Sequence, residues 1–290
     1  MNRTRSASAS RAVDAAPAGG QRKRDLILKA LRGLYEYFWM YAGLLYLGAI
    51  GLVYSSICSL LYLILGRAAP AHTAKRISAL VLRGLFRMLI ASGMLRVDLS
   101  VLQALRGRGG ILIAPNHPSL LDALLIISRF PEVGCIMKAP IWDNPVLGGA
   151  ARLMGYIRND APINMVRQAA DDLAAGVPLL VFPEGTRTRR KPVNAFKGGF
   201  ALIAKRAGAP IQTVFIETDN PFLSKGWPLF KKPTFPLVYR MRLGQAFTVE
   251  GNVHAFVRRL EQYYRDELAT PPLTQPVAQS ARTPHPGPAV

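Results

Sequence analysis

Acidic residues and cysteines are scarce in this chain of 290 residues. It has 17 Asp and Glu against 37 Lys and Arg, so its formal net charge is +20. An excess of this size favours an anionic partner, which is either a nucleic acid or a phospholipid surface. Cys58 lies in an apolar run and Cys135 in an expected strand, so we expect no disulfide between them, which suits a reducing compartment. Neither cysteine has a histidine nearby in sequence, so neither is a candidate nucleophile.

Sequence motifs for metal or nucleotide chemistry are also missing. The chain has no cluster of zinc ligands, no P-loop and no aromatic RNA-binding motif. The segment Arg106-Gly107-Arg108-Gly109-Gly110 directly precedes an apolar run, which favours a flexible turn over an RNA-binding element. We therefore expect no metal site and no nucleic-acid partner, and the anionic partner that remains is a phospholipid membrane.

Charge is absent from one long segment. From Tyr37 to Gly66 thirty consecutive residues are uncharged, whereas a helix that spans the bilayer needs only about 20 apolar residues. The segment is too long for the apolar core of a secretory signal, so we expect it to remain as a membrane anchor. Basic residues flank both ends of this segment, and basic flanks favour the cytoplasmic side of the membrane for each end. A hairpin that bends at Gly48 and Gly51 is therefore slightly favoured over a single span.

A second apolar segment follows at residues 77–97. Arg83 and Arg87 lie four residues apart in it and share one helical face, with apolar residues around them. This pattern is typical of an interfacial helix in the headgroup layer. An ordinary helix that packs on the protein core would give the same pattern, and both interpretations stay open.

The rest of the chain alternates between strand-like and helix-like segments. Strands are expected at residues 111–114, 133–137, 179–182, 211–216 and 237–243, and helices at 120–128, 164–175, 196–207 and 253–268. Such alternation predicts an α/β layered sheet. We expect a disordered basic N-terminus at 1–24, a membrane-anchoring and interfacial region at 25–97, a catalytic domain at 98–269 and a disordered proline-rich tail at 270–290.

One histidine of the four stands out by its position. His117 follows the apolar run at 111–114, at the end of an expected strand, where active sites of open α/β sheets collect. Asp122 lies five residues later, at the start of an expected helix, so the two side chains can meet. A carboxylate on one ring nitrogen would fix the tautomer of the imidazole and leave the other nitrogen as a general base.

A second motif reads Phe182-Pro183-Glu184-Gly185-Thr186-Arg187 and also follows a short apolar run. It offers backbone N–H groups, a hydroxyl and a guanidinium at the end of a strand. Arg presents a planar fork of donors to an oxyanion, so this segment is a candidate phosphate site.

The two motifs, in this order, resemble those of the lysophospholipid acyltransferase family, the 1-acylglycerol-3-phosphate acyltransferases and their relatives. The resemblance covers roughly residues 80–250, with the segment Asn116 to Asp122 matching the NHxSxxD block and Phe182 to Arg187 the FPEGTR block. It implies a layered mixed sheet flanked by helices, preceded by a membrane-anchoring helical segment. It also implies that His117 is the general base and that Asp122 orients it.

Further roles are expected in the same site. Lys138, at the end of the expected strand 133–137, is our candidate donor to the oxyanion of the tetrahedral intermediate, with backbone N–H groups near Gly185 as the alternative. The resemblance assigns substrate contacts to Asn116, Ser119, Arg158, Glu184, Gly185, Thr186 and Arg187. Two positions depart from the family pattern: Ala161 stands where an Arg is usual, so Arg158 is expected to substitute for it, and Thr213 stands where a second proline is usual.

The resemblance implies a membrane-bound O-acyltransferase of phospholipid biosynthesis. The acyl donor would be acyl-CoA or acyl-carrier protein, the acceptor a lysophospholipid such as 1-acylglycerol-3-phosphate, and no cofactor would be needed. We expect a bacterial inner membrane, with the catalytic domain on its cytoplasmic side. The departures leave other acceptors open, namely an ornithine or amino-acid lysolipid, glycerol-3-phosphate or a specialised-metabolite lipid. A non-catalytic membrane lipid-binding protein is the alternative from another class.

Overall fold

The computed structural model describes residues 19–66, 70–144 and 148–269. The expected disordered segments, 1–24 and 270–290, therefore lie mostly outside the described residues. The boundary at residue 24 is wrong, because helix α1 (Gly19–Leu65) already begins at residue 19. The chain divides into two compact units, residues 1–38 and 39–290, and helix α1 runs through the division.

Helix α1 contains residues 37–65 of the uncharged segment and is continuous for 47 residues. It passes through Gly48 and Gly51 without a break, so the favoured hairpin with a bend at these glycines is wrong. In the described part of the chain, α1 alone is long and apolar enough to cross a membrane, and only 11% of its most apolar stretch is buried. A core helix of a soluble protein would bury most of that surface, so the exposure is consistent with a membrane anchor.

Helix α2 (Ala71–Ala91) packs antiparallel to the part of α1 that follows residue 38. Tyr46 donates a hydrogen bond to the carbonyl of Val81 at 3.1 Å, and Tyr54 donates to that of Ala74 at 2.7 Å. The helices approach closely at Gly84, where a Cβ atom would lie 2.7 Å from the hydroxyl of Tyr46. One face of α2 therefore packs as a core helix does, while its other face remains exposed.

The described residues form a sheet of seven strands in the order β1-β7-β6-β2-β5-β3-β4. Every neighbouring pair is parallel except β6 with β7, so the sheet is mixed as predicted. The strands are β1 (Leu95–Asp98), β2 (Leu112–Pro115), β3 (Gly134–Lys138), β4 (Ile157–Asn159), β5 (Leu179–Leu180), β6 (Ile211–Glu217) and β7 (Leu237–Phe247).

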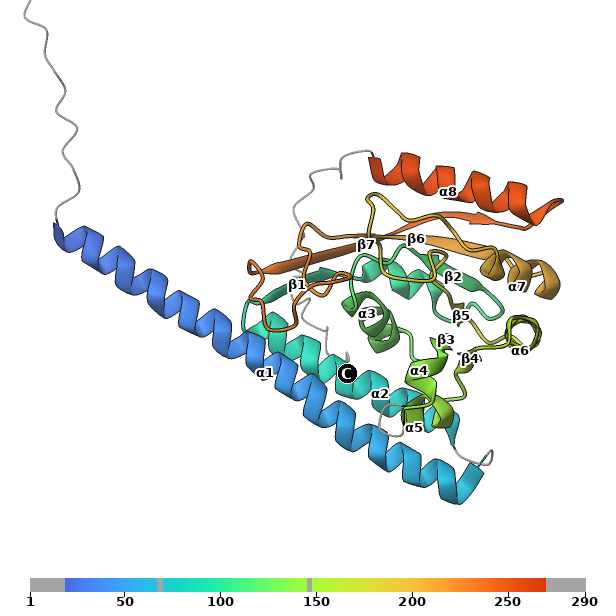
Figure 1. Cartoon of the computed structure of the whole chain (residues 1–290), viewed down its shortest axis with the longest axis horizontal. Helices are drawn as coiled ribbons and strands as arrows, with labels where there is room; N and C mark the ends of the chain where they lie inside the picture. Colours follow the sequence, from blue (N-terminus) through green and yellow to red (C-terminus); the bar gives the residue numbers. More distant parts are fainter. Residues whose placement is uncertain (1–18, 67–69, 145–147, 270–290) are drawn as a thin grey trace, which may run out of the picture. The chain divides into compact units, whose positions relative to one another are not determined.

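Helices cover both faces of this sheet (Figure 1). Within β6, Phe215 belongs to one hydrophobic cluster and Val214 to the other, because successive side chains of a strand point to opposite faces. One cluster contains residues of α2, α3 (Leu121–Arg129) and α5 (Gly148–Leu153), and the other contains residues of α6 (Pro162–Ala174), α7 (Gly199–Ala207) and α8 (Val253–Ala269). The predicted layered α/β architecture is confirmed.

Several short elements were not predicted. Strand β1 begins at Leu95, so the sheet starts before the expected domain boundary at residue 98. Strand β4, helix α4 (Ala139–Trp142) and the 3-10 helix η2 (Ser100–Leu105) span only three to six residues each, too few to show a periodic pattern. Helix α7 ends in a C-cap at Gly208, which adopts the left-handed conformation with φ of 62°.

Candidate active site

The sheet order brings the two motifs together. Strands β2 and β5 are parallel neighbours, and β3 pairs with the other side of β5. Their carboxyl ends therefore meet at one edge, where ligands bind in open α/β sheets. His117 follows β2, the segment Phe182 to Arg187 follows β5, and Lys138 ends β3.

His117 and Asp122 form a direct pair. Asp122 sits in the first turn of α3, and its Oδ2 lies 3.0 Å from Nδ1 of His117. The same oxygen accepts the backbone N–H of Ser119 at 2.7 Å. The Asp122 side chain is fully buried and that of His117 is 14% exposed. Because a carboxylate only accepts, Nδ1 carries the proton, and Nε2 is left as the basic atom.

Burial makes Asp122 an unusual carboxyl group. Desolvation raises its pKa to about 6, although the hydrogen bond and charge of His117 act in the opposite direction. Its Oδ1 has no hydrogen-bond partner in the described part of the chain, and neither does the buried hydroxyl of Tyr239 on β7. Burial first, and then the negative charge of Asp122, raise the pKa of Tyr239. Asp122 therefore keeps its charge in a site that favours the neutral acid.

The ring of Phe182 stacks on His117, with centroids 3.8 Å apart and planes 18° from parallel. Next to it, the backbone N–H of Thr188 donates to the carbonyl of His117 at 2.7 Å. The loop after β5 therefore fixes both the ring and the backbone of His117. The second motif thus supports the base directly, a role that its sequence did not reveal.

Glu184 takes a structural position instead of the expected contact with the acceptor. Its Oε1 accepts the backbone N–H of His117 at 2.9 Å and the hydroxyl of Thr188 at 2.7 Å, and its Oε2 accepts the N–H of Asn194 at 2.8 Å. The residue is 1% exposed. Both oxygens are engaged inside the protein, and a carboxylate has no donor to offer a phosphate. Glu184 joins the two motif loops.

Asn116 and Ser119 are also turned inward. The amide of Asn116 donates to the carbonyl of Ile216 at 2.9 Å and accepts the N–H of that residue at 2.7 Å. Ser119 donates its hydroxyl to the carbonyl of Phe222 at 2.9 Å. Both residues are buried, so they shape the loop after β2, and neither presents a free polar group to a substrate as expected.

Cationic side chains gather beside the second motif. Lys225 donates to the hydroxyl of Thr186 at 2.9 Å. Partial burial, followed by the positive charges of Arg189, Lys138 and Arg187, lowers the pKa of Lys225. These four cations, called the cationic cluster below, come from the ends of β3 and β5 and from the loop after β6. Sequence reasoning missed Lys225 and Arg189 because neither belongs to a recognisable motif.

Arg187 is held within this cluster by backbone carbonyls. Its Nη1 donates to Leu223 at 2.7 Å and to Ser224 at 3.1 Å. Leu223 has a φ of 55°, a left-handed conformation that costs a leucine about 1–3 kcal/mol. The same carbonyl accepts the N–H of Leu120 at 3.1 Å, so this strained residue ties the loop after β6 to both motif loops. Nε and Nη2 of Arg187 make no hydrogen bond with any other described residue and are left for a ligand.

Arg158 lies away from this cluster. It is on β4, three strands from β2, or about 14 Å at 4.8 Å per strand. Its guanidinium forms salt bridges with Asp143, at 2.6 Å, and with Asp160. The side chain lines a separate cavity of about 470 Å³, together with Ala161 and Tyr156. The expected help from Arg158 in binding the acceptor is therefore not supported by its position.

Gly185 makes the turn after β5 possible. Its φ is +63°, and its N–H donates to the carbonyl of Phe182 at 2.9 Å. That N–H is therefore not available as the alternative oxyanion donor. Lys138 is exposed at the end of β3 and remains the candidate. In the described ranges, no group of three or more His, Cys, Asp or Glu side chains could hold a metal ion.

A buried carboxylate beside a histidine, next to cations that form no ion pair with another described residue, is an arrangement capable of general-base catalysis on an anionic substrate. Residues 96–217 match the family model described as Acyltransferase. The chain is 31% identical to a chloroplastic 1-acyl-sn-glycerol-3-phosphate acyltransferase of Brassica napus, over 38% of this chain and 34% of that relative. With the 1-acyl-sn-glycerol-3-phosphate acyltransferase of Helicobacter pylori it shares 28% identity, over 55% of this chain and 68% of the relative.

The structure resembles the crystal structure of PlsC, the 1-acyl-sn-glycerophosphate acyltransferase from Thermotoga maritima. The TM-score is 0.57 at 19% sequence identity, over 83% of this chain and 96% of that one, which is a likeness of fold. The match to the plant relative spans only about one third of its length. Together with the shared motifs, these matches support a likeness of this chain to the 1-acylglycerol-3-phosphate acyltransferase, or PlsC-type, family.

Proposed function

We propose that this protein is a membrane-bound O-acyltransferase that moves a fatty acyl group from a thioester to the free hydroxyl of a lysophospholipid such as 1-acylglycerol-3-phosphate. The observation that supports it best is the pair of His117 and Asp122, with 3.0 Å between Nδ1 and Oδ2. A binding protein has no need of a base with a buried orienting carboxylate. The names of the relatives favour the same class of acceptor.

The geometry supports a proton relay through His117 in two steps, addition and collapse. Nε2 takes the proton from the acceptor hydroxyl as its oxygen attacks the thioester carbonyl, and Asp122 stabilises the imidazolium that forms. When the tetrahedral intermediate collapses, the C–S bond breaks and the imidazolium returns the proton to the leaving thiolate. Atoms and charge balance without a metal or an organic cofactor. A positioned base of this kind contributes about 10²- to 10⁴-fold to the rate.

The cationic cluster has the chemistry to hold the phosphate of the acceptor. Lys225, Arg187 and Arg189 offer donors beside the base, and Arg forms two parallel hydrogen bonds with a phosphate. Lys138, the fourth member, is our candidate donor to the oxyanion. The acyl donor would be acyl-CoA or acyl-carrier protein, both of which carry a thioester on a phosphopantetheine arm.

A membrane anchor formed by α1 would hold this chemistry where lysolipids reside. We infer a bacterial inner membrane with the catalytic domain on its cytoplasmic side, because Arg76 and Arg83 follow the uncharged segment on the side of that domain. A single span by α1 would leave Arg22, Lys23 and Arg24 on the opposite side. Reducing conditions on the cytoplasmic side agree with two free cysteines.

Two variants of the full chain test the proposal. The chain is purified in a neutral detergent and supplied with acyl-CoA or acyl-carrier protein as donor, and thiol release and product mass are measured. His117→Ala should reduce turnover by at least 10²-fold. His254→Ala, in an exposed histidine on α8, is the matched control and should turn over normally. Unchanged turnover in His117→Ala would refute the mechanism.

The acceptor is identified in the same assay. A panel of 1-acylglycerol-3-phosphate, a zwitterionic lysolipid, an ornithine lysolipid and glycerol-3-phosphate separates the alternatives. Lys225→Gln should raise KM for acceptors with an exposed phosphate and leave KM for the ornithine lysolipid unchanged. Transfer to the ornithine lysolipid alone would retain the chemistry and refute the phosphate acceptor. Binding of lysolipids without any product would support the non-catalytic alternative.

A further inference from the structure

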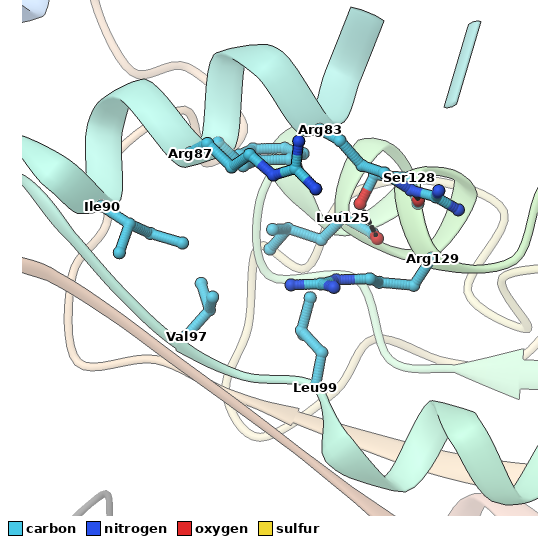
Figure 2. A pocket seen from close by; sticks show the side chains of 9 residues that line it. Arg83, Arg87, Ile90, Val97, Leu99, Leu125, Ser128 and Arg129 are labelled. Carbon is cyan, nitrogen blue, oxygen red and sulfur yellow. Dashed lines mark hydrogen bonds between the residues drawn. The ribbon is translucent and has the colours of Figure 1, made fainter. Parts of the chain in front are cut away.

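A second group of arginines surrounds a small pocket between α2 and α3 (Figure 2). Arg83 and Arg87 come from α2 and Arg129 from the end of α3. The apolar part of the lining includes Phe86 and Leu99, and the volume is about 30 Å³. A single water needs about 10–15 Å³ on this measure, so the pocket can hold two or three small polar atoms.

Arg83, which lines this pocket, and Arg106, which lies outside its lining, each have a clear structural task. The last carbonyls of a helix have no partner within the helix, and at the carboxyl end of α3 Arg83 donates to the carbonyl of Ser128 at 2.6 Å. Arg106, from the turn after η2, donates to the carbonyl of Arg129 at 3.3 Å. These bonds satisfy backbone carbonyls at the end of α3, where the helix dipole is equivalent to only about half a negative charge.

The other two arginines have no such task. The guanidinium groups of Arg87 and Arg129 make no hydrogen bond or ion pair with any other described residue. No acidic side chain lines the described pocket. Asp98, the nearest acid along β1, is engaged by the backbone and hydroxyl of Ser100. Four positive charges therefore face about half a negative charge, which leaves a strong local excess.

The electrostatic effect of this excess is visible in Arg129. Partial burial, followed by the positive charges of Arg83, Arg106 and Arg87, lowers the pKa of its guanidinium. A group of like charges is stable only when an anion or solvent compensates it. A phosphate oxygen between Arg87 and Arg129 would compensate it at the rim of the pocket.

The surface next to the pocket indicates where such a phosphate comes from. Ile77, Leu80 and Ile90 recur at helical spacing on α2, in line with Arg83 and Arg87, and they are 43%, 60% and 41% exposed. Arginines and large apolar side chains on one exposed stripe are typical of a helix in the interface of a bilayer. A free phosphate ion would gain nothing from these apolar neighbours, whereas a phospholipid would cover them.

We propose that Arg87 and Arg129, supported by Arg83 and Arg106, form a binding site for the phosphate of an intact anionic phospholipid, separate from the acceptor site. Helix α3 divides the two sites, since Asp122 lies in its first turn and Arg129 at its end, seven residues or about 10 Å away. A lipid bound here would fix the carboxyl end of α3 at the membrane while the amino end holds the catalytic carboxylate.

Lipid binding to the full chain tests the site. The chain is held in a neutral detergent, and native mass spectrometry counts the bound molecules of dioleoylphosphatidylglycerol. Both acyl positions of this lipid are already esterified, so it is not an acceptor lysolipid. All proteins carry Lys225→Gln, so that binding at the cationic cluster contributes little. We expect one tight binding event whose affinity falls at least tenfold in Arg87→Gln/Arg129→Gln.

A matched double variant distinguishes a specific lipid site from a general effect of positive charge on lipid binding. Arg167→Gln/Arg206→Gln removes the same two charges from exposed positions on α6 and α7 and should retain the tight binding event. Because Arg87 and Arg129 have no described partners, their substitution should leave Tm within about 2 °C. Equal loss in both double variants, or no loss in either, would overturn the proposal.

Two further ligands identify the source of the phosphate. Dioleoylphosphatidylcholine should bind at least tenfold more weakly than the phosphatidylglycerol, because its choline repels the arginines. Inorganic phosphate should compete only at much higher concentration, because it lacks the acyl chains that cover Ile77 and Leu80. Competition by inorganic phosphate at the same concentration as the lipid would show a site for a free anion and refute a phospholipid site.

Discussion

Glu184→Gln distinguishes a structural carboxylate from a substrate contact. Glu184 accepts three hydrogen bonds, from His117 N at 2.9 Å, Thr188 Oγ1 at 2.7 Å and Asn194 N at 2.8 Å. Glutamine has a single acceptor oxygen. If that oxygen stays with His117 and Thr188, the amide group faces the N–H of Asn194, and two donors meet in a buried place. The variant thus loses one bond and weakens two.

The cost follows from these three bonds. A buried donor without a partner costs about 1–3 kcal/mol, and each remaining bond loses about 1 kcal/mol when its acceptor is no longer charged. Removing the buried negative charge also removes its desolvation cost, which offsets part of this loss. We therefore expect the free energy of unfolding to fall by about 3 kcal/mol. A domain of this size loses about 2–4 °C in Tm per kcal/mol, so Tm should fall by about 6–12 °C.

Thermal unfolding in detergent and steady-state kinetics measure the two consequences. The loop that carries His117 should lose its fixed position, so kcat should fall while KM for the acceptor stays within about threefold. Glu250→Gln, at an exposed position after β7, is the control and should leave Tm and kcat unchanged. An acceptor KM raised tenfold at an unchanged Tm would refute our reasoning and return Glu184 to the substrate site.

Three further predictions concern Asp122 and its surroundings. Asp122→Asn should lower kcat by about 10⁴-fold with little change in KM, because an amide cannot hold the required tautomer of His117; a loss below tenfold in steady-state kinetics would contradict this role. The value of kcat/KM should fall as the pH drops below about 6, since burial raises the pKa of Asp122 to about 6 and the neutral acid no longer stabilises the imidazolium. A constant kcat/KM down to pH 5 would contradict this role of Asp122. Tyr239→Phe should leave Tm unchanged or raise it by a few degrees, because it removes a buried hydroxyl without a described partner; a fall of more than about 4 °C in thermal unfolding would reveal a bound water or other partner.

The raised pKa of Asp122 also has a consequence for stability. A carboxyl group whose pKa is higher in the folded state stabilises the fold fully below its unfolded value, near 3.9, and loses that contribution as the pH rises through about 6. At pH 7 the ionised carboxylate therefore costs the fold about 3 kcal/mol, from about two pKa units at 1.36 kcal/mol each. Asp122→Asn should thus be inactive and yet at least as stable, which is the usual relation between strain and function at an active site.

The sequence by itself determined the pairing of His117 with Asp122 and the class of fold. His117 and Asp122 are five residues apart across a strand end and the first turn of a helix, so local geometry alone brings them within 3.0 Å. Apolar runs likewise predicted β2, β3, β5, β6 and β7 of the layered sheet, whereas β1 and β4 were missed. The uncharged segment from Tyr37 to Gly66 predicted a membrane anchor, although its glycines suggested a bend that the continuous helix α1 does not have.

The tertiary structure decided what the other motif residues do. Glu184 accepts a hydrogen bond from a residue 67 positions earlier, and Asn116 pairs with one 100 positions later. Lys225 joins the cationic cluster only because the loop after β6 folds over the end of β5. Arg129 meets Arg87 only because α2 packs on α3. A sequence pattern records neighbours along the chain, whereas hydrogen bonds, burial and charge act between neighbours in space, and strand order alone determines which segments become such neighbours.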